Sequence, residues 1–289
     1  MKPIVPLLVL HVMANLALAQ GRIENPIVIE PRVQTELGTV DFYAHNLSHV
    51  PYAVIMDFTL LLNYEPSARV PFIFNAPPTP RRVFSLRVRT KINPSDYRYT
   101  MTYSMGCVRT KPKELDYGIP VAEGTSVKVA PHPYYGHVGE TEPPSSWYAL
   151  GFESDKGPMP VVASRKGRVV RVQEDGSVLV AHEDCTFAFY SGLSLASLSV
   201  KDADLVMPGQ RIGMATARLT LMVYYRDDRS LEPYRKQTYT GHPWIYIKPE
   251  FRTAEGRMRI DEQQRLRSAY PEDLVTQEMT RAERRRRGN

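Results

Sequence analysis

Four side chains between positions 132 and 155 could hold a metal ion. His132, His137 and Glu142 lie on one loop-like stretch, and Asp155 follows it closely. Imidazole nitrogens and carboxylate oxygens are ordinary zinc ligands, but a catalytic zinc needs three protein ligands that converge in space. Sequence spacing does not show convergence. The alternative interpretation is that these are surface residues of a loop.

Aromatic residues are concentrated in the same stretch. Tyr134, Tyr135, Trp147 and Tyr148 each combine a flat apolar face with a polar tip, which suits the binding of a sugar or a peptide. Packing in the core of a β domain is the alternative for the same side chains.

The chain has two cysteines, Cys107 and Cys185. They cannot form a structural zinc site by themselves, because such a site takes four ligands, usually in close pairs. Two interpretations remain open, namely a Cys107–Cys185 disulfide and two separate, half-buried thiols, since spacing alone does not show proximity.

Alternating apolar and polar residues predict that the chain is mainly β. Residues 39–44, 83–88 and 97–103 alternate in this way, which places one face of each strand on a core. Proline and asparagine clusters divide the region into short strands. We therefore expect a β-sandwich over residues 20–110.

A second β-rich region follows a Lys- and Pro-containing linker at 110–115 and extends over residues 116–256. Within it, 168–172 and 177–182 are predicted to form a hairpin, because Glu174-Asp175-Gly176 supplies turn residues. Residues 257–289 are polar and basic, and are predicted to be a tail with one or two short helices and a frayed end at Arg284–Arg287.

Six short motifs in this second region occur in an order that is known from one family. They are Tyr148–Phe152, Met159–Ser164, Gly167–Val170, His182–Tyr190, Val206–Gly213 and Leu219–Tyr224. Together they resemble the lysostaphin-type (LytM-like) zinc metallopeptidases, which cut peptide cross-links in bacterial cell walls. The region before them resembles the β-sandwich that often precedes this domain. The resemblance implies a LytM-like, β-rich peptidase fold for residues 116–256.

The residues that do chemistry in that family are replaced here. The family uses a His, an Asp and the second His of a His-x-His pair as zinc ligands, with further histidines that assist the water. By the resemblance, the corresponding positions are Glu142, Gly151, Gly192, Arg218 and Thr220. Arginine stays protonated and cannot ligate zinc, and glycine has no donor. We therefore expect no catalytic residues, no cofactor and no metal; the alternative is a displaced zinc site built from His137, His132 and Asp155.

The retained turns of the motifs predict that the β core still closes around a groove with Arg218 at its floor. A guanidinium there would pair with a carboxylate of a wall peptide or of a partner protein. The alternative is that Arg218 pairs with Glu153 or Asp155 of its own chain. Together with Arg218, the predicted binding residues are Tyr135 and Trp147.

The first residues resemble a secretory signal. Lys2 precedes an apolar run that ends in Ala17-Leu18-Ala19, which predicts a signal peptide over residues 1–19 and a periplasmic or secreted protein. An uncleaved N-terminal anchor is the alternative. No second long apolar segment follows, so the mature chain is not expected to span a membrane. The net charge of +6 does not by itself argue for nucleic acid.

Three functions remain as hypotheses. The first is an exported non-catalytic LytM-like protein that binds peptidoglycan or regulates a cell-wall hydrolase, as degenerate relatives of the family activate wall amidases. The second is an active zinc metalloendopeptidase on peptidoglycan cross-links with a displaced site. The third is a general envelope scaffold.

Overall fold

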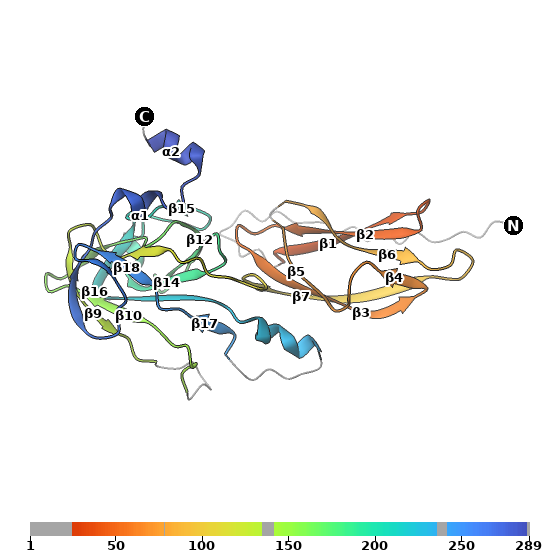
Figure 1. Cartoon of the computed structure of the whole chain (residues 1–289), viewed down its shortest axis with the longest axis horizontal. Helices are drawn as coiled ribbons and strands as arrows, with labels where there is room; N and C mark the ends of the chain where they lie inside the picture. The colour runs from red at the N-terminus through yellow and green to blue at the C-terminus, as the bar shows by residue number, and fades with distance from the viewer. Residues whose placement is uncertain (1–24, 78, 135–141, 236–241, 288–289) are drawn as a thin grey trace.

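The computed structural model describes residues 25–77, 79–134, 142–235 and 242–287. The expected signal segment and the candidates Tyr135 and His137 lie outside these ranges. The described chain is mainly β, as its alternation predicts. It forms two lobes that lie end to end along the long axis of the molecule (Figure 1). Strands β1 to β7 build the first lobe, and the remaining elements build the second.

The strands of the first lobe are β1 Ile27–Gln34, β2 Thr39–Asn46, β3 Tyr52–Leu62, β4 Tyr64–Pro66, β5 Phe72–Asn75, β6 Arg81–Val88 and β7 Asp96–Met105. They form a four-stranded sheet in the order β1-β2-β6-β4 and a three-stranded sheet in the order β5-β3-β7. The strands predicted at 39–44, 83–88 and 97–103 are confirmed within β2, β6 and β7.

One apolar core fills the space between the two sheets of the first lobe. Phe42 and Phe84 of one sheet pack in the same cluster as Val54 and Met56 of the other. Alternate residues of each strand point into this cluster, so the sequence period of two is what joins the sheets. The arrangement is a β-sandwich.

The strands of the second lobe are β8 Asp116–Gly118, β9 Ser126–Pro131, β10 Leu150–Glu153, β11 Met159–Val162, β12 Gly167–Val172, β13 Val178–Ala181, β14 Phe187–Leu193, β15 Leu205–Val206, β16 Arg211–Arg226, β17 Trp244–Tyr246, β18 Glu250–Thr253, β19 Gly256–Met258 and β20 Gln264–Arg267. Two 3-10 helices, Leu195–Ser197 and Asp228–Arg235, and two α-helices, α1 Glu272–Thr276 and α2 Arg281–Arg287, complete it.

The long strand β16 organises the main sheet of this lobe, whose order is β15-β12-β13-β14-β16-β10-β9-β20. Strands β11 and β17 also pair with β16, and β19-β18-β8 form a small separate sheet. The hairpin predicted between 168 and 182 is confirmed as β12 and β13. Gly176 in its turn has a φ of 84°, a conformation that glycine adopts without steric cost.

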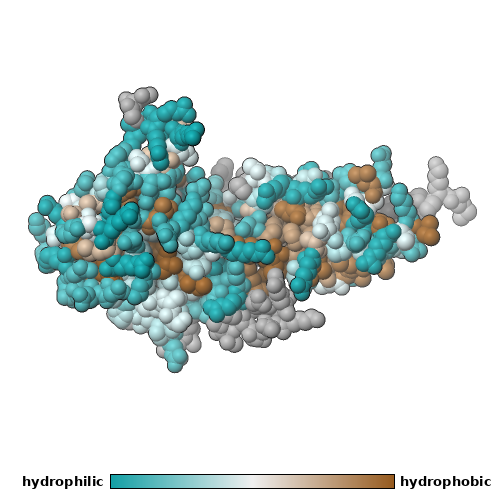
Figure 2. Space-filling view, in the orientation of Figure 1, coloured by the Kyte–Doolittle hydropathy of each residue, from teal (hydrophilic) through white to brown (hydrophobic). Residues whose placement is uncertain are grey.

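The segment after residue 256 differs from the expected polar tail. Strand β20 pairs with β9, while Ile260 and Leu274 are buried. The two short helices that the sequence predicts are present as α1 and α2, and α2 includes the basic residues up to Arg287. The local composition does not predict β20, because a strand that completes a distant sheet is stabilised by that sheet and not by its neighbours in sequence. Helix α2 projects from the lobe with a hydrophilic surface (Figures 1 and 2).

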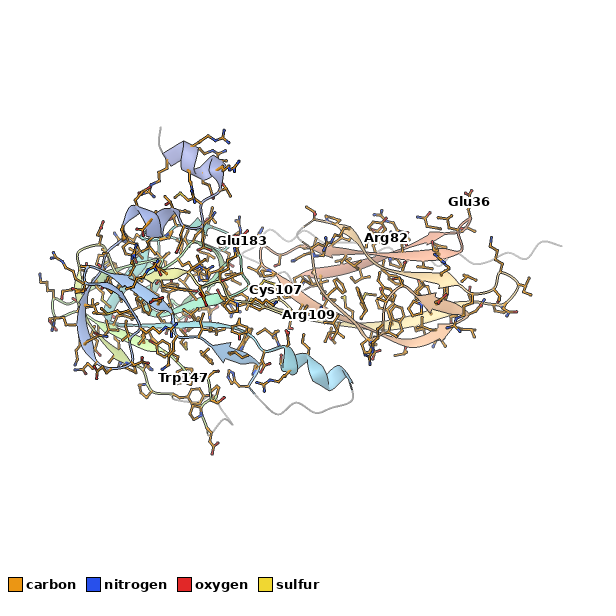
Figure 3. All side chains as sticks on the ribbon, viewed as in Figure 1. Glu36, Arg82, Cys107, Arg109, Trp147 and Glu183 are labelled. Atoms are coloured by element: carbon orange, nitrogen blue, oxygen red, sulfur yellow. A yellow bond between two sulfur atoms is a disulfide. The ribbon has the colours of Figure 1, made fainter. Side chains whose placement is uncertain are left out.

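A disulfide between Cys107 and Cys185 joins the end of the first lobe to a turn of the second (Figure 3). Of the two interpretations left open by the sequence, the structure shows the bridge, with the Cα atoms 5.8 Å apart. Val50 packs against Leu179 and Phe187 at the same junction. A covalent and an apolar contact thus connect the lobes.

None of the helices in the described ranges is long and apolar enough to cross a membrane.

Candidate functional site

Four of the five positions that the family resemblance marks as vacated come together on the main sheet, and the fifth, Glu142, lies outside it in the segment before β10. Strand β16 lies between β10 and β14, and the register places Thr220 opposite both Gly151 and Ser191. Gly192 follows directly and lies against the backbone of Arg218, so that a Cβ at this position would collide with the Arg218 carbonyl. Three strands distant in sequence therefore place these positions in one small area.

The guanidinium of Arg218 covers Gly151. A Cβ added to Gly151 would lie 2.6 Å from Nε and 2.9 Å from Cζ of Arg218, both far inside van der Waals contact. A longer side chain such as aspartate has no room while Arg218 keeps this position. The two residues are thus complementary: the absence of a side chain at Gly151 leaves the space that Arg218 fills.

Arg218 is incompletely paired in this position. Its nearest acid is Glu153, with 3.5 Å between Nε and the carboxylate oxygen, and the two side chains are 40% and 44% exposed. Nε itself is shielded from solvent, and no hydrogen bond to the described residues satisfies it. Of the two acids of its own chain that the sequence offered as partners of Arg218, the structure shows Glu153, and the contact is long. Asp155 instead pairs with Arg265 at 2.5 Å.

The described residues at these positions do not fit a zinc ion, while the candidate ligand His137 lies outside the described ranges. Gly151 has no donor, Arg218 places a positive charge over it, and Asp155 is held by Arg265, whose hydrogen bond lowers the pKa of that carboxyl. Within residues 25–77, 79–134, 142–235 and 242–287, no three or more His, Cys, Asp or Glu side chains are grouped to bind a metal. Glu142 is exposed, and Nδ1 of His132 lies 2.8 Å from the Pro133 carbonyl.

A groove of about 550 Å³ opens beside these positions on the same face of the sheet. Its floor consists of alternate residues of β14 and β16, and its walls consist of aromatic residues from the segment between β9 and β10 and from strand β17. The lining residues are His132, Pro133, Tyr134, Trp147, Phe189, Ser191, Thr220, Met222, Tyr224, His242, Pro243, Trp244 and Tyr246.

The aromatic walls are held by contacts between segments about a hundred residues apart. Trp147 packs edge-on against Tyr246 with 4.8 Å between ring centroids, and its Nε1 donates to the His132 carbonyl at 3.1 Å. Tyr224 and Trp244 lie 5.2 Å apart on the other side of Tyr246. Trp147 lies on the side of the second lobe where these loops emerge (Figure 3).

Of the predicted binding residues that the structure describes, one lines the groove and one lies beside it. Trp147 lines the groove, whereas Arg218 lies on the next position of the same strand face, two residues from Thr220. Tyr148 is buried, with its hydroxyl donating to the Ile260 carbonyl at 2.6 Å, so it belongs to the core.

Trp244 and Tyr246 were missed by sequence reasoning. One signal could have found them: the chain has only two tryptophans, and Trp244-Ile245-Tyr246 alternates aromatic side chains as a strand presents them to one face.

A second arginine, Arg165, is the centre of a buried ionic cluster of this lobe. Its side chain is 0% exposed and contacts Asp184 at 3.0 Å and Glu278 at 2.8 Å. Tyr117 and Thr186 accept from its Nη1 at 3.0 and 3.3 Å. Glu278 follows α1, so this cluster holds the C-terminal segment on the lobe.

His182 belongs to the same turn as Asp184. Its Nδ1 lies 2.7 Å from the Lys166 carbonyl, which can only accept, so Nδ1 carries the proton. Burial, with the Arg165 charge nearby, lowers the pKa of His182 to about 3. The ring is neutral and structural, as expected for a histidine that is bonded to a strand end.

Comparisons with known proteins give a limited similarity. Pseudoalterin, a deep-sea M23 metalloprotease, is 13% identical with a TM-score of 0.33 over 55% of this chain and 100% of that chain. Helicobacter pylori Csd3, in an orthorhombic crystal, is 16% identical with a TM-score of 0.29 over 65% of this chain and 46% of its own. No family model and no curated protein matches. Since both TM-scores lie below 0.5, we argue function from this chain's own residues.

Proposed function

We propose that this chain is an exported, non-catalytic LytM-like protein that binds peptidoglycan at the face formed by Arg218 and the aromatic groove. The observation that carries the proposal is the position of the Arg218 guanidinium over Gly151, where the resembled family has a zinc-ligating carboxylate. A cation there opposes a metal ion but attracts a carboxylate.

The groove supports a binding role for the same face. It combines aromatic walls with a few hydroxyl groups, the usual composition of sites for organic ligands. Arg218 adds one incompletely paired cation at the end of the groove, and the stem peptides of peptidoglycan carry carboxylates. Binding of such a fragment needs neither the zinc nor the histidines that the sequence lacks.

The test compares retention of the purified protein on insoluble wall fragments for wild type, Arg218→Ala and Arg211→Ala. Arg211 lies on the same strand but is exposed and outside the groove, so it is a matched control. We expect Arg218→Ala to weaken retention about tenfold, corresponding to about 1.4 kcal/mol, and Arg211→Ala to leave it unchanged.

Four outcomes would contradict the proposal. Equal retention of both variants would remove Arg218 from the site, and no retention of wild type would exclude wall binding. Metal analysis that finds about one zinc per chain, with peptide cleavage abolished by a chelator, would establish the displaced-site enzyme instead. Capture of a wall hydrolase without binding to wall fragments would favour the regulatory role.

A further inference from the structure

The side chains that line the aromatic groove indicate whether its ligand is charged or uncharged. Among the residues that the structure describes, those lining the groove include no Asp, Glu, Lys or Arg, although Arg218 and Glu153 lie just beyond its end. An ionic ligand would therefore lose its hydration inside the groove without gaining a counter-charge. The groove suits a ligand that is uncharged where it enters.

The floor of the groove carries two hydroxyl groups that are free for a ligand. Ser191 of β14 and Thr220 of β16 are direct cross-strand neighbours, so their side chains lie on one face about 5 Å apart at Cβ. Neither hydroxyl has a hydrogen-bond partner among the residues that the structure describes. A purely apolar ligand would bury both without partners, at a cost in free energy.

The walls provide flat aromatic faces in a continuous series. Tyr134, Trp147, Tyr246, Tyr224 and Trp244 contact one another in this order, with centroid separations of 4.8, 4.8, 5.5 and 5.2 Å. Because each ring is held by the next, little side-chain entropy is lost when a ligand binds. Flat apolar walls over a floor of hydroxyl groups complement a ring whose faces are C–H and whose edge is hydroxyl.

We propose that the groove binds an uncharged sugar ring, which stacks on Trp147 and exchanges hydrogen bonds with Ser191 and Thr220. This inference deepens the proposed function, because the glycan of the wall is the expected source of the sugar. It concerns the groove alone and does not use Arg218.

The two tryptophans of the chain make the test site-specific, since Trp147 and Trp244 both line the groove. The experiment titrates an uncharged oligomer of N-acetylglucosamine into the full protein and follows tryptophan fluorescence and heat. We expect a saturable change in both signals for wild type.

Variants separate stacking from folding. Trp147→Ala should weaken binding about tenfold or more, through loss of stacked aromatic surface, while Trp147→Phe should retain most of it. Thr220→Val keeps the shape but removes the hydroxyl, and is expected to weaken binding about fivefold. Thr216→Val, an exposed position of the same strand, is the matched control and should bind as wild type does.

Absence of any saturable signal with the neutral oligomer would overturn the inference. The same holds for binding that Trp147→Ala and Thr220→Val leave intact while both variants keep the wild-type circular dichroism spectrum. Either result is distinguishable from failure of the proposed function, because Arg218-dependent retention on wall fragments is measured separately and would persist if only the sugar site were wrong.

Discussion

Arg165 and Arg218 lie in the same lobe and differ in almost every physical respect. Arg165 is fully buried and pairs with two carboxylates, a phenol and a hydroxyl. Arg218 is 40% exposed, with one long contact to Glu153. The first arginine therefore has its hydrogen-bonding capacity used within the fold, whereas the second has capacity left for a ligand.

This difference separates a structural role from a binding role within one lobe. The turn that carries His182, Asp184 and Thr186 keeps its hydrogen bonds, and Arg165 depends on it. Arg218 has no comparable network of partners among the described residues. Stability and binding should consequently respond to different substitutions.

The largest expected effect comes from Arg165→Met. It leaves Asp184 and Glu278 with side chains 1% and 5% exposed and without their cation, which should lower the free energy of unfolding by about 3–5 kcal/mol. Denaturant titration measures this, with Arg168→Met, at an exposed neighbouring position, as the control. A loss below about 1 kcal/mol would refute the structural role of Arg165.

Removal of the disulfide should cause the next largest loss in the free energy of unfolding. The bridge closes a separation of 78 residues and fixes the turn next to Asp184, so Cys107→Ser with Cys185→Ser is expected to cost about 2–4 kcal/mol. Reductant added to the wild type should give the same loss. If reduction has no effect on unfolding, the bridge does not support the Arg165 cluster.

Low pH should also destabilise the fold at the buried Arg165 cluster, because His182 lies in the same turn as Asp184. Because burial lowers the pKa of His182 to about 3 in the folded state, below the 6.5 of an exposed histidine, the unfolded chain binds a proton first as pH falls. Stability from this group is complete above pH 6.5 and is lost towards pH 3, by at most about 1.4 kcal/mol per pH unit. His182→Gln should flatten this part of the wild-type pH profile, as measured by denaturant titration at a series of pH values.

Substitution of Arg218 should change stability little. Exposed ion pairs contribute about 0–1 kcal/mol, so Arg218→Ala is expected to unfold within about 0.5 kcal/mol of wild type while its retention on wall fragments decreases. A large loss of stability would mean that Arg218 is a structural residue like Arg165, and the comparison would fail.

The smallest effect concerns Gly151. Gly151→Ala should displace the guanidinium and cost more in wild type than in the Arg218→Ala background, because the three nearest atoms to a new Cβ all belong to Arg218. A coupling of about 0.5 kcal/mol or more between the two positions is expected in a double-mutant cycle. Strict additivity would show that the arginine does not rest over Gly151.

The amino-acid sequence determined the parts of this protein that depend on near neighbours. Alternation placed β2, β6 and β7, and an Asp-Gly turn placed the β12–β13 hairpin, since side-chain period and turn conformation are local properties. The resemblance in sequence also predicts that Gly151, Arg218 and Thr220 stand at positions where the resembled family has its metal-site residues.

The tertiary structure alone decided how distant segments meet. It joined Cys107 to Cys185, added β20 to β9, and brought Trp147 against Tyr246 across about a hundred residues. It also placed Arg218 over Gly151, a contact set by strand register that no local pattern encodes. These contacts depend on packing between elements, and packing is a property of the assembled fold rather than of any segment within it.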